Sequence, residues 1–172
     1  MSLAISDPLK KKLEGDVVSG FLLASGNPYK VLRDGIPPEP DKMCEHRGNG
    51  RQVGIEIVTV YYDQDHAKSV WPPARGGKPL SYGINRKDSV ENVRLLAKCL
   101  RSIRAKSWKH YTVTDYLVLV VFTYPQCLYL CDLEERIETL SLPTEHQFNE
   151  ICLMSQHGEV YRLFPNKDWI LR

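Results

Sequence analysis

The sequence predicts one α/β (α+β) domain over residues 1–172, with a mixed central β-sheet flanked by helices. Three observations lead to this fold class. A segment with apolar residues at helical spacing comes first, and two β-rich segments joined by a turn follow it. A second helical segment then precedes a nearly continuous apolar run, which is typical of a strand covered on both faces. Elements in this order pack as layers around a common core.

The first helix is predicted to begin at Pro8, with Asp7 as its N-cap, and to end at the stop signal of residues 25–28. Residues 7 and 8 are typical of a helix start because Asp accepts a bond from a free N–H and Pro needs none. Its expected buried stripe consists of Leu9, Leu13, Val17, Phe21 and Ala24.

A β-hairpin is predicted over residues 39–62. Residues 41–45 are a candidate strand, and residues 52–62 are a strand because they are rich in β-branched and aromatic side chains. Gly48-Asn49-Gly50 between them is a hairpin turn signal. Residues 29–34 are a further candidate strand before the hairpin.

The second half begins with a long connection over residues 63–87. A helix capped by Asp88 or Ser89 follows, and a buried strand over residues 115–124 ends at Pro125. A short helix and then two short strands within residues 151–164 are expected after it. The expected buried stripe of the second helix, with its basic residues pointing away, is Val93, Leu96, Ala97, Leu100 and Ile103.

The composition is that of an ordinary globular protein, with 42% hydrophobic and 26% charged residues among 172. It excludes a disordered tail, a collagen-like fibre and a coiled coil. No apolar run approaches the about 20 residues that cross a bilayer, and the N-terminus lacks a secretory signal pattern. The expected compartment is therefore the cytoplasm, with no membrane partner. The five cysteines are expected to be buried thiols rather than disulfides or zinc ligands.

Positive charge is concentrated in the second predicted helix. The net charge is only +2, yet residues 94–109 hold six basic residues and no acidic one. Two interpretations stay open for this run: a solvated helix face, or a surface that contacts nucleic-acid phosphates.

Two carboxylates stand out on the predicted hairpin. Glu56 lies in an otherwise apolar strand, where a buried carboxylate is costly unless a cation or a hydrogen-bond donor meets it. Asp41, after Pro40, lies on the opposite arm, so the two carboxylates can converge on Mg²⁺ or Mn²⁺. Glu14 on the first helix is a candidate third ligand. The alternatives are an edge-strand Glu56 facing water and an exposed Glu14.

Pro40-Asp41 followed by residues 54–59 (GIEIVT) resembles the PD-(D/E)XK nuclease superfamily. Residues 103–106, 108–111 and 148–153 are also similar, and the resemblance covers about residues 7 to 165. It implies a restriction-endonuclease-like fold. It further implies that Asp41 and Glu56 bind a divalent cation that activates water against a phosphodiester.

Val58 departs from the pattern of this superfamily, which has a lysine two residues after the Glu. That lysine positions the attacking water and stabilises charge in the transition state, and valine can do neither. Relocation of the amine to a neighbouring element is known in the family. The candidate donors are Lys98 and Lys106 on the second helix, and Lys42 beside Asp41.

The leading hypothesis is a Mg²⁺-dependent nuclease, with DNA as the expected substrate. Its alternative is a catalytically inactive nuclease-fold protein that binds nucleic acid or a protein partner, so enzymatic activity is left open. A third possibility is an unrelated α/β domain in which Asp41 and Glu56 never meet. Oligomeric state is also open, with a homodimer included. The candidate nucleic-acid contacts are Arg75, Lys78, Arg94, Arg101 and Lys106.

Overall fold

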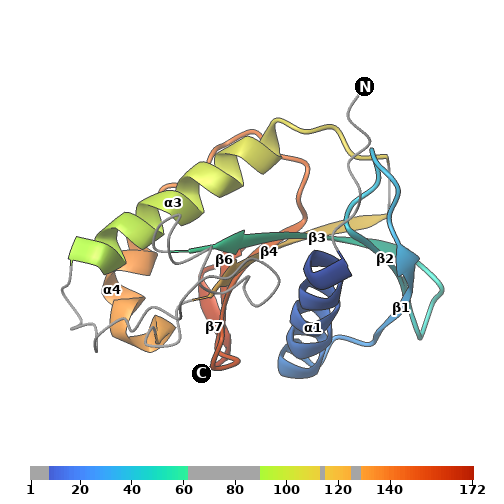
Figure 1. Ribbon diagram of the computed structural model, residues 1–172, viewed down its shortest axis with the longest axis horizontal. Coiled ribbons are helices and arrows are strands. Elements are labelled where there is room, and N and C mark those ends of the chain that lie inside the picture. The colour runs from blue at the N-terminus through green and yellow to red at the C-terminus, as the bar shows by residue number, and fades with distance from the viewer. Residues whose placement is uncertain (1–7, 62–89, 113–114, 125–128) are drawn as a thin grey trace.

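The computed structural model describes residues 8–61, 90–112, 115–124 and 129–172. Their strands form one seven-stranded sheet in the order β1 to β7, so neighbours in the chain are neighbours in the sheet (Figure 1). The strands are β1 (Tyr29–Asp34), β2 (Lys42–His46), β3 (Gln52–Val60), β4 (Tyr116–Thr123), β5 (Glu150–Ser155), β6 (Val160–Phe164) and β7 (Asp168–Leu171). The helices are α1 (Pro8–Ser25), α3 (Val90–Ser107), the 3₁₀ helix η2 (Leu130–Leu133) and α4 (Glu134–Glu138).

The type of strand pairing changes twice across the sheet, from antiparallel to parallel and back to antiparallel. The central strands β3, β4 and β5 are parallel, and the outer neighbours on both sides pair antiparallel. Parallel strands need a crossover on a face of the sheet, and α3 stands in the crossover from β3 to β4. The predicted mixed sheet with flanking helices is therefore confirmed.

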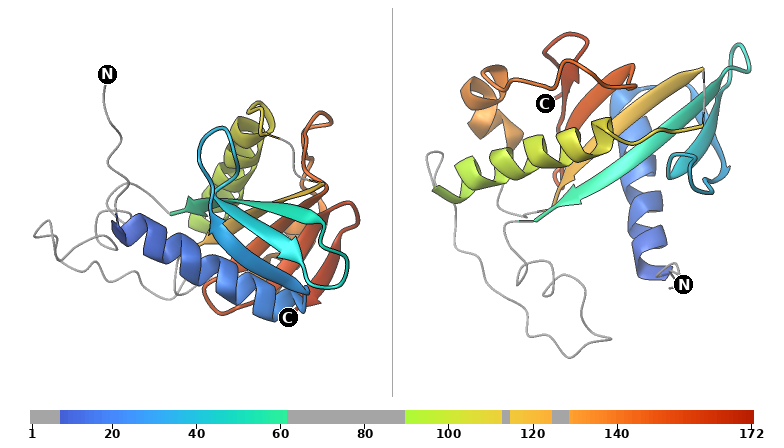
Figure 2. Two further views of the ribbon diagram at one scale, coloured as in Figure 1. Left: turned by 90° about the vertical axis from the view of Figure 1, so that its right-hand side faces the viewer. Right: turned by 90° about the horizontal axis from the view of Figure 1, so that it is seen from above.

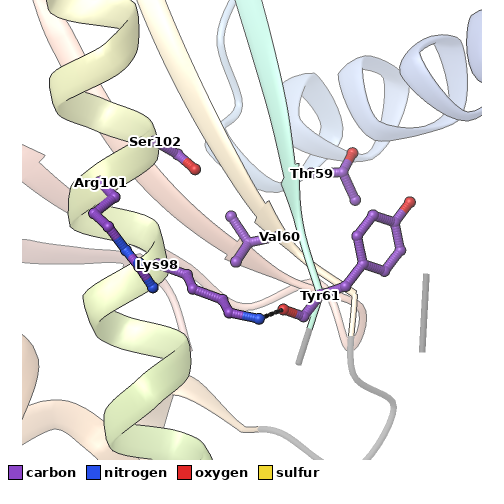
Figure 3. A pocket seen from close by; sticks show the side chains of 6 residues that line it. All are labelled: Thr59, Val60, Tyr61, Lys98, Arg101 and Ser102. Atoms are coloured by element: carbon purple, nitrogen blue, oxygen red, sulfur yellow. Dashed lines mark hydrogen bonds between the residues drawn. The ribbon is translucent and has the colours of Figure 1, made fainter. Parts of the chain in front are cut away.

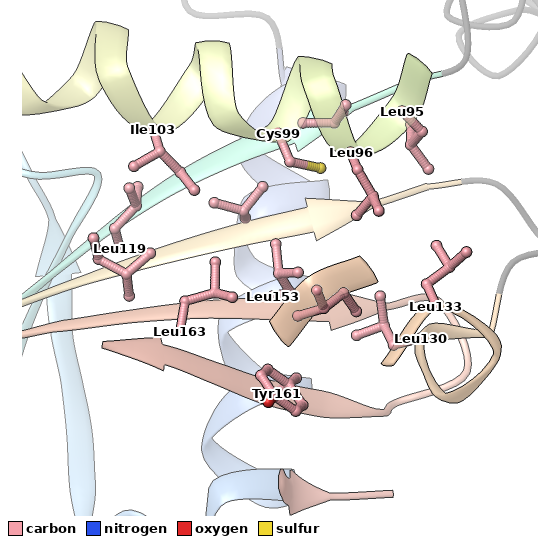
Figure 4. Packing of buried hydrophobic residues seen from close by; sticks show 14 of the residues in the cluster. Leu95, Leu96, Cys99, Ile103, Leu119, Leu130, Leu133, Leu153, Tyr161 and Leu163 are labelled. Atoms are coloured by element: carbon pink, nitrogen blue, oxygen red, sulfur yellow. The ribbon is translucent and has the colours of Figure 1, made fainter. Parts of the chain in front are cut away.

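Helices cover both faces of the sheet, which explains the apolar character of its middle strands. On one face α3, η2 and α4 pack over a cluster that includes Leu119 and Leu153 (Figures 1 and 4). On the other face α1 packs over a second cluster that includes Ile55 and Val120 (Figure 2). Alternation along β3 sends odd residues towards α1 and even residues towards α3.

Most predicted elements are confirmed, with shifts of one or two residues at their ends. The helix at 8–25, the strands near 29–34, 41–45 and 52–62, the buried strand and the two strands around residue 157 are all present. The 168–171 strand, β7, was not predicted, because a four-residue edge strand has too little pattern to stand out. No described helix is long and apolar enough to cross a membrane.

The predicted buried stripe of α3 is wrong in part. Val93 is 44% exposed and Ala97 is exposed, whereas Leu95 and Cys99 are fully buried. Both stripes have helical spacing, and packing on the sheet selects the one that passes through Leu95 and Cys99. The residues that α3 buries are Asn92, Leu95, Leu96, Cys99 and Ile103.

This rotation also corrects the expectation that every basic residue of the helix points away from the sheet. Lys106 lies three residues after Ile103 and continues the buried stripe at the last turn of α3. Its side chain is only 18% exposed. The sheet-facing side of α3 therefore ends in a lysine.

The described cysteines are free thiols, in agreement with the expectation for them. Cys44, Cys99 and Cys152 are buried and Cys131 is half-buried. Burial raises the pKa of Cys44 to about 11 and that of Cys99 to about 12. Cys127 lies outside the described residues.

Candidate active site

Asp41, just before β2, is hydrogen-bonded to Glu56 and to the next residue of β3, Ile57. The register of the hairpin pairs Lys42 with Ile55, which brings the preceding Asp41 opposite Glu56. The Asp41 backbone N–H donates to Glu56 Oε2 (3.1 Å), and the Ile57 backbone N–H donates to Asp41 Oδ2 (2.8 Å). The hairpin therefore brings the two residues opposite each other, so the possibility that they never meet is wrong; that their carboxyl groups share a cation stays a prediction.

Glu56 is a buried carboxylate in the middle of the sheet. Strand β3 lies between β2 and β4, and Glu56 is 3% exposed, so the alternative of an edge-strand Glu facing water is wrong. Its even position directs it to the α3 face, the same face as Val58, which packs half-buried against the core there. A charge in this position requires a compensating cation.

Lys106 supplies that cation. Its Nζ donates to Glu56 Oε1 in an ion pair between a largely buried amine and a buried carboxylate. The structure thus places the amine of Lys106, one of the candidate donors, against Glu56; its role as that donor stays a prediction. Such a pair inside a protein is costly to form and more costly to break, since removing one partner leaves the other charge buried.

The other two candidate lysines lie elsewhere. Lys98 Nζ donates to the backbone oxygen of Tyr61 (3.3 Å), beyond the C-terminal end of β3 and away from Glu56. Lys42 Nζ contacts Asp34 Oδ1 (2.5 Å), and its position in β2 places it with Cys44 on the α1 face. The structure therefore brings Lys106 alone of these three candidates to the carboxylates.

A braced loop holds Asp41 in place. Arg33 donates two hydrogen bonds to the Glu39 carboxylate (2.6 and 2.8 Å), and the Ile36 N–H donates a third (2.9 Å). These bonds, those of Arg33 above all, lower the pKa of Glu39 to about 2. Gly35 donates its N–H to the Asp41 backbone oxygen (3.0 Å), and a Cβ at Gly35 would lie 1.7 Å from the Pro40 oxygen. Only glycine fits there.

Tyr111 faces the same carboxylates and was missed as a site residue. Its hydroxyl is buried and lies beside the Glu56 carboxylate. Burial raises its pKa most, and the negative charges of Glu56 and Asp41 raise it further. The hydroxyl therefore stays protonated, as a donor next to the Glu56 carboxylate. Its signal in the sequence was slight: one tyrosine five residues after Lys106, within the segment similar to the nuclease superfamily.

Glu14 lies close enough to Asp41 for the charge of Asp41 to affect the pKa of the Glu14 carboxyl. Burial raises the pKa of its carboxyl most, Asp41 raises it further, and Lys10 and Lys42 oppose the shift. The Glu14 side chain is 13% exposed and contacts Lys10 Nζ (3.3 Å). The alternative of an exposed helix residue is therefore wrong, although no carboxylate contact between Glu14 and Asp41 is present.

The carboxylate oxygens of Asp41 and Glu56 meet part of what a hard divalent cation requires of its ligands. Asp41 Oδ1 accepts no hydrogen bond from the described residues, while both Glu56 oxygens are engaged. Mg²⁺ commonly takes one or two protein carboxylates and fills its other positions with water and phosphate, so Asp41 and Glu56 fit that need. Within the described ranges, no group of three or more His, Cys, Asp or Glu residues is arranged to hold a metal ion. The predicted three-carboxylate set with Glu14 is therefore not assembled in this arrangement.

Basic residues of α3 extend from this site along the helix. Arg94 and Arg101 are exposed, as a role in phosphate contact requires. Lys98, Arg101 and Ser102 line a pocket of about 330 Å³ beside residues 59–61, at the far end of β3 from Glu56 (Figure 3). Arg75 and Lys78, the other two candidate contacts, lie outside the described residues.

Comparison of the chain with protein-family models, with curated proteins and with solved structures finds no match in any of the three. The functional argument therefore depends on the residues of this site and their geometry.

Proposed function

We propose that this protein is a Mg²⁺-dependent nuclease with a restriction-endonuclease-like fold, and that DNA is its substrate. One observation carries the proposal: Lys106 of α3 contacts Glu56 of β3, and Glu56 in turn contacts Asp41 at the start of β2. An amine thus contacts the Glu56 carboxylate, which also accepts a hydrogen bond from the Asp41 backbone, while the Asp41 carboxylate accepts one from the adjacent Ile57 N–H. That combination is suited to phosphodiester hydrolysis, in which a cation site and a charge-stabilising donor are both needed.

Each group has a separate role in this mechanism. Asp41 and Glu56 would hold Mg²⁺, which lowers the pKa of a bound water and offsets negative charge on the phosphate. Lys106, held by Glu56 in a site of low solvent exposure, orients the attacking water and stabilises the charge that grows on the phosphate oxygens. Tyr111 stays protonated and donates a hydrogen bond to a phosphate oxygen.

Val58 supports relocation of the lysine in this proposal. It lies on the same face as Glu56, where the superfamily has its lysine, but it packs against the apolar core under α3. The Lys106 amine reaches Glu56 from above that face. An amine can therefore serve the same carboxylate from the helix while the strand position contributes to the core.

One observation favours a second candidate, a nucleic-acid-binding protein without catalysis. Lys106 engages one Glu56 oxygen and the Asp41 N–H engages the other. Such contacts also occur in a purely structural ion pair. The exposed arginines of α3 would then bind phosphates without cleaving them.

A cleavage assay distinguishes the two candidates. Supercoiled plasmid and labelled oligonucleotides are incubated with Mg²⁺, Mn²⁺ or EDTA and with wild type, Asp41→Asn, Lys106→Met or Lys98→Met. The nuclease proposal expects cleavage by wild type with metal and by Lys98→Met, the matched lysine control, and none with EDTA or the other two variants. Binding by wild type with no cleavage under either metal supports the second candidate.

A further inference from the structure

Two large apolar side chains are exposed on loops next to the candidate site. Trp108 is 78% exposed and Ile36 is 71% exposed. Large apolar side chains normally lose water contact on folding, and a tryptophan this exposed has most of its ring surface available to a ligand. Trp108 follows the last residue of α3, and Ile36 lies in the loop between β1 and β2.

The two loops are joined to each other and to the site. The Thr112 backbone N–H donates to the Pro38 oxygen (3.2 Å), so the segment after α3 contacts the loop that leads to Asp41. Figure 2 shows the C-terminal end of α3 and the β1–β2 loop on the same side of the sheet. Trp108 comes two residues after Lys106, which holds Glu56. Trp108 therefore lies on the segment that runs from Lys106 to the contact with the β1–β2 loop.

Charge around Trp108 indicates the chemistry of its ligand. The neighbouring exposed side chains are basic: Arg104 precedes it by one helical turn and Lys109 follows it directly. No acidic residue occurs in residues 94–109. An aromatic ring among cations is the pattern of a surface for a polyanion with flat apolar rings, which is a nucleic acid with bases free to stack.

We propose that Trp108 is a platform on which an unpaired base stacks next to the cleaved phosphodiester, with Ile36 of the β1–β2 loop as a second exposed apolar contact. A paired base in a duplex is covered on both faces by its neighbours, whereas an unpaired base offers a face to the ring. The substrate class is therefore nucleic acid with unpaired bases at the cleavage position, rather than continuous duplex. This inference rests on the proposed nuclease function for its position relative to the cleaved bond.

The test compares binding of matched single-stranded and blunt duplex oligonucleotides in EDTA, so that no cleavage intervenes. Fluorescence anisotropy is measured for wild type, Trp108→Ala, Trp108→Phe and Tyr129→Ala, the last a control that removes an exposed aromatic next to η2. We expect wild type to bind the single strand more tightly than the duplex. Trp108→Ala should weaken single-strand binding by about tenfold or more, the loss expected for one stacked base. Trp108→Phe should keep most of the affinity, and Tyr129→Ala all of it.

Two outcomes overturn the inference: unchanged single-strand affinity in Trp108→Ala, or an equal loss for single strand and duplex. A self-association of wild type that Trp108→Ala abolishes, with oligonucleotide affinity unchanged, also overturns it, because Trp108 would then bind protein. Since Trp108 is exposed, folding of the variant is expected and is checked by its thermal melt.

A parallel cleavage assay with Mg²⁺ separates this inference from the proposed function. Wild type that binds the single strand through Trp108 but does not cleave contradicts the nuclease and supports the platform. Wild type that cleaves, with Trp108→Ala binding and cleaving the single strand equally well, supports the nuclease and overturns the platform. If the protein is a nuclease and Trp108 is its stacking platform, Trp108→Ala should raise KM for the single strand more than it lowers kcat.

Discussion

The two ends of the contact between α3 and β3 carry the same kind of residue in different surroundings. At one end Lys106 meets the buried carboxylate of Glu56, next to Asp41. At the other end Lys98, eight residues earlier on the same helix, donates to a backbone oxygen beside an open pocket (Figure 3). A lysine on this helix becomes part of the candidate site only where the facing strand presents an acid.

The facing strand explains the difference. The residues of β3 that point to α3 are Glu56, Val58 and Val60, so negative charge is present at one end only. The buried charge of Glu56 needs a cation, and Lys106 meets it. Lys98 donates to the Tyr61 backbone oxygen beyond the end of β3. Under the proposed function, the chemistry would take place at the Lys106 end of this contact.

The largest effect is expected for the carboxylates. Asp41→Asn and Glu56→Gln should each lower Mg²⁺-dependent cleavage by about 10³-fold, because each removes a charge that holds the cation. Calorimetric titration with Mn²⁺ should show weaker binding in both variants. Glu45→Gln, on the same hairpin, is the matched control and should behave as wild type. If Asp41→Asn still cleaved at the wild-type rate, Asp41 and the Lys106 end of the α3–β3 contact would have no part in the cleavage reaction.

The next effect is on stability. Lys106→Met should lower the free energy of unfolding in EDTA by about 3 kcal/mol, because Glu56 is left buried without its cation. Lys98→Met should cost about 1 kcal/mol or less, the net value of one hydrogen bond. Adding Glu56→Gln to Lys106→Met should recover most of the loss. Urea denaturation measures the free energy of unfolding of wild type, the two single lysine variants and the double variant. Equal losses for Lys106→Met and Lys98→Met would contradict the difference between the two ends of the α3–β3 contact.

A smaller effect is expected on binding to nucleic acid. Changing Arg94 and Arg101 together to alanine should weaken binding to every sequence alike and flatten the dependence of affinity on salt by about two units in a log–log plot. Cleavage at saturating substrate should be preserved, because neither arginine contacts the carboxylates. A salt dependence identical to that of wild type would show that the arginine side of the helix contacts no phosphate.

The smallest effect concerns Glu14. Its folded-state pKa is raised above the ordinary 4.5, so its ionised form costs stability at neutral pH. Glu14→Gln should therefore raise the free energy of unfolding in EDTA, by less than about 1 kcal/mol for a partly exposed group. As pH falls through the raised pKa, Glu14 in wild type takes up a proton. The extra stability of Glu14→Gln over wild type therefore disappears towards pH 4.5. Thermal melts at several pH values test this, with Glu135→Gln as control; a gain that grows on acidification would contradict it.

Local sequence signals were sufficient for the order of elements and for the meeting of Asp41 with Glu56. The hairpin turn fixes the register, and the register determines which residues lie opposite each other. The rotation of α3 was not available from the sequence, because two stripes that share Leu96 and Ile103 have equal helical spacing. Only packing against the sheet selects between them, and that selection decides whether Lys106 or another basic residue reaches Glu56.

Tyr111 and β7 were missed for a related reason. The Tyr111 hydroxyl gains its importance from carboxylates that are distant in the chain, and no pattern of neighbouring residues reveals them. Strand β7 is short and pairs at an edge, so it depends on β6 for its existence. Contacts between distant segments, rather than propensity, determine both features.

The most direct test of the account is the single-turnover rate of oligonucleotide cleavage by Lys106→Met and Lys98→Met, measured with saturating protein and Mg²⁺. The two variants remove the same group from the same helix, so their difference reports on position alone. The account predicts a loss of about 10²-fold or more in Lys106→Met, the scale of one charge-stabilising donor, and a rate close to wild type in Lys98→Met. Equal rates in the two variants, or a larger loss in Lys98→Met, would contradict the assignment of Lys106 to the site.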